Sequence, residues 1–304
     1  MSKSDDLFPI SGSAKPSDAI SALIKSVRLR DIPEAVLWLT HLWVLPRERQ
    51  RVKRRVLLMA GEDNISAGVI ECAADWYDSP RRRSLEEAAI EVVRICATPN
   101  WYAQPDGRQY IYAWRMAEPH SRKFTGDTLD GLFDILREAV KDRELLTGLA
   151  AFNAIYKRRD FRPHPFAELL VELAYTSTHQ QAKRLAQVYH RMAGALWTDG
   201  NISGQCVYAL MCGEFGNQEV PEANPEMAVQ LIVQAEERLH GAVAVPTFAL
   251  DGIHTRGGND RRFAGVVEQM EGCCRAYEYY GRLSPNDVWL PEFLDVTPDP
   301  EILN

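Results

Sequence analysis

The sequence lacks the patterns that mark membrane, secreted and zinc-binding proteins. No stretch approaches the ~20 consecutive apolar residues that a transmembrane helix requires. The N-terminal residues MSKSDDLFPISGSAKPSD contain no apolar core of a signal peptide. The six cysteines form no CxxC pair, and none stands at zinc-ligand spacing from a histidine. We therefore expect a cytoplasmic protein with reduced cysteines, no metal and no cofactor.

An excess of positive charge is also absent. The 304 residues include 35 Lys and Arg against 42 Asp and Glu, which gives a formal net charge of −7. A protein of this charge binds nucleic acid through a local basic patch, because its overall charge repels phosphate. The apolar fraction of 46% and the charged fraction of 25% are typical of a globular protein.

Apolar residues recur at helical spacing through most of the chain. Ile20, Leu23, Ile24 and Val27 predict a helix over 18–29. Further helices are predicted over 31–45, 47–60, 64–77, 84–97, 127–157, 165–175, 177–197, 203–213, 225–239 and 263–280. The sequence therefore predicts an all-α (mainly α) fold, built as a helical bundle.

Changes in composition divide the chain into four predicted segments. Residues 1–16 are polar and are expected to form a flexible lead. Residues 17–97 form a first helical domain, and residues 98–240 a helical domain that continues the bundle. Residues 241–304 combine a loop-rich segment, a final helix and a C-terminal tail.

Aromatic residues interrupt the helical pattern near 101–114. They flank a Pro105-Asp106-Gly107 turn, which predicts one small β-hairpin. Two other interpretations stay open. The aromatics alternate with Arg108 and Arg115 and could stack on single-stranded bases, or they could form an oligomer interface.

The segment 17–64 carries an ordered series of short motifs. It begins SDAISALIKSVRLRDIPEAVLWLTHLW and ends RERQRVKRRVLLMAGEDN. It resembles the C-terminal helical (collar, or oligomerisation) region of the RarA (replication-associated recombination protein A) family of clamp-loader-type AAA+ ATPases. In that family, a helix of the AISALIKS type is followed by an Asp-Pro-Ala-Ala-x-x-Trp-Leu helix. A third helix ending Arg-Arg-Leu and Ala-Ser-Glu-Asp comes next. The resemblance implies that residues 17–97 are a collar-like helical domain.

One motif of that family is missing. The family's ATPase core lies upstream of its collar, and this chain has no GxxxxGK[ST] loop to hold the phosphates of ATP. We therefore expect a protein without P-loop ATPase activity. The resemblance implies a non-enzymatic, homo-oligomeric scaffold, a tetramer by analogy, in DNA replication, recombination or repair. The alternative is an accessory or decoy subunit that co-assembles with a separate AAA+ ATPase.

A basic cluster begins the third predicted helix, and we expect it to contact DNA phosphates or a partner's acidic residues. The alternative is a solvated helix face whose arginine stems cover apolar surface. Arg81-Arg82-Arg83 is a shorter basic run of the same kind. The predicted DNA- or partner-binding residues are Arg47, Arg49, Arg51, Lys53, Arg54 and Arg55.

A glycine-containing loop near the C-terminus concentrates acidic, basic and imidazole groups. Its arginines and free amides could bind phosphate or a partner, and an Asp–His pair could orient a general base. The second possibility would make the protein an enzyme acting on phosphate-containing substrates, although no nucleophile accompanies the pair. The third possibility is a structural loop. The residues concerned are Asp251, His254, Arg256, Asp260, Arg261 and Arg262.

Overall fold

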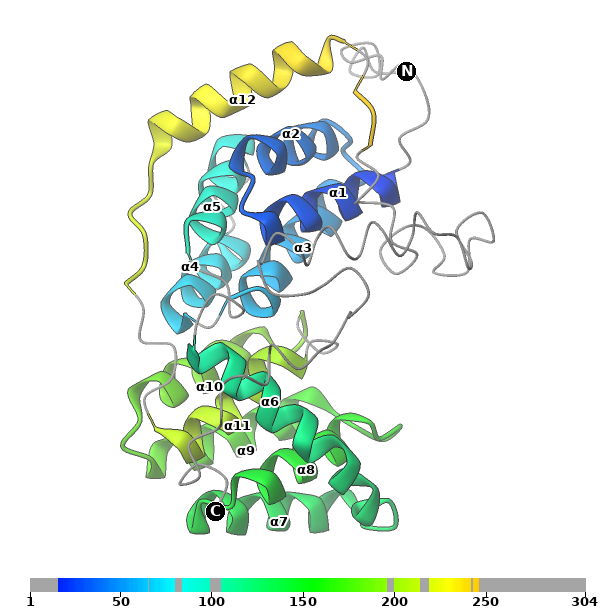
Figure 1. The fold of residues 1–304 in the computed structure, drawn as a ribbon, viewed down its shortest axis with the longest axis vertical. Coiled ribbons are helices and arrows are strands. Elements are labelled where there is room, and N and C mark those ends of the chain that lie inside the picture. The colour runs from blue at the N-terminus through cyan, green and yellow to red at the C-terminus, as the bar shows by residue number, and fades with distance from the viewer. Residues whose placement is uncertain are drawn as a thin grey trace. The chain divides into compact units, whose positions relative to one another are not determined.

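A computed structural model describes residues 16–245, except 65, 80–83, 99–104, 196–199, 214–218 and 242. These residues form α-helices and one short 3-10 helix, η2, without a strand among them, which confirms the all-α prediction (Figure 1). In this part of the chain, no helix combines the length and apolar character needed to span a membrane. Residues 1–15 of the predicted lead (1–16) lie outside the described residues, and Pro16 begins the first helix. The predicted final helix (263–280) and the loop residues 251–262 also lie outside them.

The helices follow one another with short connections. Their bounds are α1 (Pro16–Leu29), α2 (Ile32–Trp43), α3 (Arg49–Glu62), α4 (Ala67–Asp78), α5 (Leu85–Ala97), α6 (Pro105–His120), η2 (Ser121–Phe124), α7 (Leu129–Asp142), α8 (Leu145–Tyr156), α9 (Pro163–Thr176), α10 (Gln180–Met192), α11 (Gly200–Cys212) and α12 (Pro225–Leu239).

The described residues divide into two compact units. Those within 16–59, 75–98 and 221–245 belong to unit 1, and those within 60–74 and 105–220 belong to unit 2. The predicted segments 17–97 and 98–240 do not coincide with these units, because α12 packs on α2 and α5 of unit 1.

Unit 1 is organised around α1 and α2, whose side chains are almost all buried. The Asp31 side chain accepts a hydrogen bond from the Glu34 backbone N–H (3.1 Å) and caps the first turn of α2. Glu34 also accepts from Trp38 Nε1 (2.9 Å) and forms an ion pair with Arg238 of α12 (2.9 Å). Leu37 of α2 also packs in a buried cluster with Ala235 and Leu239 of α12. These contacts fix α12 on α2.

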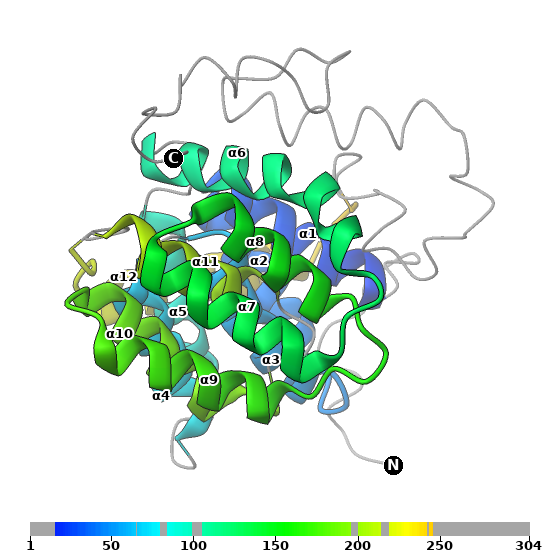
Figure 2. The same cartoon turned by 90° about the horizontal axis from the view of Figure 1, so that it is seen from below.

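Unit 2 has an aromatic core centred on α8, which contacts both α6 and α7 (Figure 2). The fully buried Phe152 ring packs edge-on against Trp114 (5.5 Å between centroids) and stacks on Phe166 (5.8 Å). Gln205 Nε2 of α11 donates to the backbone oxygens of Gly61 (2.9 Å) and Asn64 (3.0 Å). The end of α3 is thereby tied to this unit.

The β-hairpin predicted at 101–114 is wrong for residues 105–114, because these residues begin α6. Pro105 occupies the first helical position, where its missing N–H costs nothing. Tyr110, Ala113 and Ala117 then line one buried helix face at spacings of three and four. Tyr110 packs edge-on against Tyr208, which is buried, and against Trp114, which is half-buried, so these aromatics serve packing. Residues 101–104 lie outside the described part.

Gly204 allows α6 and α8 to pack closely against α11. A Cβ at this position would lie 2.5 Å from the Tyr110 hydroxyl oxygen and 2.6 Å from Trp114 Cζ3, both on packed aromatic side chains. We expect Gly204→Ala to lower the free energy of unfolding by about 1–3 kcal/mol, measured by chemical denaturation. The control is Gly194→Ala, whose Cβ meets no atom within 4 Å. A Gly204→Ala variant as stable as this control would contradict the packing described.

Candidate anion-binding site

The predicted basic segment occupies the turn after α2 and the first half of α3. Arg49 Nε donates to the Trp43 backbone oxygen (2.7 Å), which is an end carbonyl of α2. Arg51 pairs with Glu48 (3.3 Å). Lys53 Nζ donates to the Tyr77 backbone oxygen (3.2 Å) and lies 5.4 Å from the centroid of the Trp76 ring.

These contacts give much of the basic segment a role in packing unit 1. Arg54 and Arg55 are half-buried and also have interaction partners. Arg47 and Arg51 remain exposed at the start of the segment. Contact between this segment and DNA therefore stays a prediction.

The other residues predicted to bind a ligand either lie outside the described part of the chain or are packed against neighbours. Arg81-Arg82-Arg83 lies outside the described residues, as does the loop that contains Asp251, His254, Arg256, Asp260, Arg261 and Arg262. Tyr110 and Trp114 are packed against aromatic neighbours and are not presented for stacking on bases. In the described part of the chain, no three His, Cys, Asp or Glu residues stand together as a metal site.

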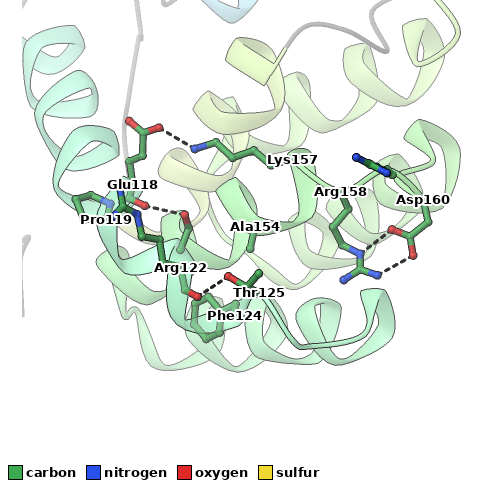
Figure 3. A pocket seen from close by; sticks show the side chains of 11 residues that line it. Glu118, Pro119, Arg122, Phe124, Thr125, Ala154, Lys157, Arg158 and Asp160 are labelled. Carbon is green, nitrogen blue, oxygen red and sulfur yellow. Dashed lines mark hydrogen bonds and ion pairs between the residues drawn. The ribbon is translucent and has the colours of Figure 1, made fainter.

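A groove of about 1010 Å³ lies in unit 2, between the end of α6, η2 and the turn that follows α8 (Figure 3). Its lining is strongly charged at both sides and apolar at Ala154 and Phe124. The lining residues are Glu118, Pro119, Ser121, Arg122, Phe124, Thr125, Ala154, Lys157, Arg158, Arg159 and Asp160.

Local hydrogen bonds shape one wall of the groove. α6 ends at His120, directly after Pro119, and the chain continues as η2. The buried Ser121 hydroxyl donates to the Glu118 backbone oxygen (2.7 Å), and the Thr125 hydroxyl donates to the Arg122 backbone oxygen (2.6 Å). The first bond satisfies a carbonyl near the C-terminal end of α6. The second adds to the bond that the Thr125 backbone N–H makes to the same Arg122 oxygen (3.3 Å). The wall that carries Arg122 is thus held by side chains on either side of it.

The opposite wall is the turn after α8, and Arg158 holds it in place. Arg158 Nε and Nη2 bind the two Asp160 carboxylate oxygens (2.7 and 2.8 Å), and Nη1 donates to the Asp127 backbone oxygen (2.6 Å). The hydrogen bonds from Arg158 lower the pKa of Asp160, and those bonds raise the pKa of Arg158 in turn. Both groups are therefore charged at neutral pH, and each of the three guanidinium nitrogens makes a hydrogen bond.

Lys157 connects the two walls. It caps the C-terminus of α8, where its backbone N–H donates to the Asn153 oxygen (3.2 Å). Its Nζ binds Glu118 Oε1 (2.7 Å), and both side chains are 55% exposed. Figure 3 shows this pair reaching across from α8 to α6. Because both side chains are exposed, this ion pair is weak.

Arg122 and Arg159 are exposed, and within the described residues neither guanidinium has a hydrogen-bond or ion-pair partner. The lining contains four cations against two carboxylates, so the groove is locally positive in a chain of net charge −7. Arginine presents a planar fork of donors that matches the oxygens of a phosphate. The arrangement can therefore bind an anion with several phosphate groups.

Sequence reasoning missed this groove, although part of its signal is visible. Lys157-Arg158-Arg159 is a run of three cations, and Arg122-Lys123 is a second, shorter run. The stretch 160–165 reads only as a turn between helices. Nothing in the spacing of these runs indicates that η2 and the end of α8 lie on opposite sides of one groove.

No protein-family model, curated protein or solved structure matches this chain. The resemblance of residues 17–64 to the RarA family therefore stays a prediction. The groove is interpreted from the charges, contacts and exposure of its own residues.

Proposed function

We propose that this protein is a non-enzymatic helical scaffold that binds nucleic acid through the groove of unit 2. One observation carries the proposal: the guanidinium groups of Arg122 and Arg159 stand exposed in this groove without a described partner. In a chain of net charge −7, a local excess of cations is the feature that a phosphate backbone requires.

The size of the groove favours a chain of phosphates over a small ligand. Its volume of about 1010 Å³ lies at the upper end of small-molecule sites, which span about 300–1,000 Å³. Its lining is charged, whereas small-molecule sites are mostly apolar with a few polar groups. A phosphodiester backbone lying along the groove would meet several cations in succession.

Self-assembly is the second part of the proposal, and it draws on the resemblance to the RarA collar. On α12, the face opposite α2 and α5 exposes Val229 and Val233, which are 43% and 49% exposed and lie one helical turn apart. Apolar side chains on an outer helix face are suited to contact with another chain. The setting that we propose is DNA replication, recombination or repair.

Two measurements test the proposal. Fluorescence anisotropy with a labelled single-stranded oligonucleotide should show binding that weakens with salt. The logarithmic salt slope should be about −2 if three cations contact phosphates, because each single-strand contact contributes about −0.7. Light scattering after size exclusion should give a mass above the 34.4 kDa of one chain. Absent or salt-independent binding would refute the nucleic-acid part, and a strict monomer would refute the assembly part.

A further inference from the structure

The cations of the groove fall into three classes by what already binds them. Arg122 and Arg159 have no described partner. Arg158 is held at all three of its nitrogens by Asp160 and the Asp127 carbonyl. Lys157 is intermediate, because it forms one exposed ion pair, with Glu118.

We propose that Glu118 is a specificity-determining residue that competes with ligand phosphates for Lys157 and so lowers the affinity of the groove for linked phosphates more than for single phosphates. This inference rests on the proposed anion-binding function of the groove. In the free protein, the Glu118 carboxylate forms an ion pair with Lys157 Nζ. In the complex, a phosphate of the ligand replaces the Glu118 carboxylate on Lys157.

The energies of the two contacts make this exchange selective. An exposed Lys–Glu pair contributes about 0–1 kcal/mol, so a phosphate already held nearby can displace it. A single phosphate held by Arg122 or Arg159 gains little from opening the pair. Linked phosphates gain more, because one phosphate on an arginine raises the effective concentration of the next phosphate at Lys157. A chain therefore opens the pair and bears its cost, whereas a single phosphate on an arginine leaves the pair closed and bears none.

Arg158 cannot take the same role. Releasing its guanidinium would break two bonds to Asp160 and one to the Asp127 carbonyl, and these bonds hold the turn that carries Arg159. The Glu118–Lys157 pair, in contrast, can open without freeing the backbone of either helix end. The Ser121 hydroxyl and the Asn153 carbonyl continue to hold those ends.

The test is Glu118→Gln, which removes the charge and keeps the shape. Its affinity for a single-stranded oligonucleotide should rise about threefold to fivefold, the equivalent of a weak surface ion pair. Its preference for tripolyphosphate over inorganic phosphate should rise, because tripolyphosphate no longer has to displace a carboxylate from Lys157, whereas phosphate on an arginine displaces none. In a Lys157→Gln background, Glu118→Gln should give no gain, since the effect passes through Lys157.

Glu138→Gln is the matched control. Glu138 forms an exposed ion pair with Lys141 on α7 (3.4 Å), in the same unit and outside the groove lining. Its removal changes the net charge equally and should leave affinity nearly unchanged, because the described partner of Glu138 is Lys141, which does not line the groove. Equal gains in Glu118→Gln and Glu138→Gln would overturn the inference. A gain that survives without Lys157 would overturn it as well.

The two phosphate probes separate this inference from the proposed function. If the wild type binds tripolyphosphate but no oligonucleotide, and Glu118→Gln still raises the preference for tripolyphosphate, the groove is a small-polyphosphate site. The nucleic-acid function then falls while the role of Glu118 stands. If the wild type binds the oligonucleotide and Glu118→Gln changes neither affinity nor preference, only the role of Glu118 falls. Failure to bind either probe overturns both.

Discussion

Replacing Arg122 and Arg159 together by alanine should lower the affinity for single-stranded DNA by about a hundredfold. A hydrogen bond that involves a charged group contributes about 1.5 kcal/mol or more. Two such contacts amount to about 3 kcal/mol, which is about two orders of magnitude in Kd. The logarithmic salt slope should become shallower by about 1.4, because two single-strand phosphate contacts are lost. Anisotropy titrations at several salt concentrations measure both quantities.

The fold should survive this double substitution. Both side chains are exposed and lack described partners, and such positions usually change stability by less than about 0.5 kcal/mol. Arg47→Ala with Arg51→Ala is the informative comparison, since these two residues are exposed on the predicted basic segment. If that pair abolishes binding while the Arg122 and Arg159 pair leaves it intact, DNA binds at α3 and the groove is not the site.

Lowering the pH from 7 to 4 should cost the folded state about 3 kcal/mol at His41 alone. His41 lies in α2 with 2% of its surface exposed, and among the described residues neither ring nitrogen has a hydrogen-bond partner. Burial lowers its pKa from 6.5 to about 4. The unfolded chain therefore takes up a proton below pH 6.5 that the folded protein resists. This contribution to stability is complete above pH 6.5 and is lost as the pH falls toward 4.

His41→Leu isolates this contribution from that of the carboxylates. The difference in unfolding free energy between variant and wild type, from urea titrations, should shift by about 3 kcal/mol in favour of the variant between pH 7 and pH 4. The substitution also removes two buried polar atoms that have no described partner. His164→Gln, at an exposed position of α9, should show no comparable shift. Parallel pH profiles for wild type and His41→Leu would contradict a neutral, buried His41.

Local patterns in the sequence identified helices better than they identified contacts between helices. The helix predicted over 18–29 is α1, because its apolar residues repeat at 3.6-residue spacing. The single helix predicted over 127–157 is two helices, α7 and α8. Arg143 adopts a left-handed backbone (φ 57°) between them, and no glycine marks this break. The error at α6 arose because a PDG turn signal and a helix start at proline look alike in sequence.

Local sequence patterns could not predict the candidate site, for a different reason. Arg122 and Arg159 are distant in sequence, and they share a groove because α6, η2 and α8 pack together. Arg49 donates to a backbone carbonyl of α2, and Lys53 donates to the backbone carbonyl of Tyr77. Carbonyl partners have no signature in a sequence, since every residue carries one. A basic run alone cannot reveal which of its cations are already bound.

The contact between Glu34 and Arg238 has a consequence for the order in which the chain folds. These residues are separated by 204 positions, and unit 2 is encoded almost entirely between them. During synthesis, α2 cannot contact α12 until α12 has left the ribosome. The helices of unit 2 from α6 to α11 leave the ribosome before α12 does. Contacts of such long separation form late, since closing the loop costs entropy before it brings any contact. Unit 2 can therefore fold first, and the arrival of α12 completes unit 1.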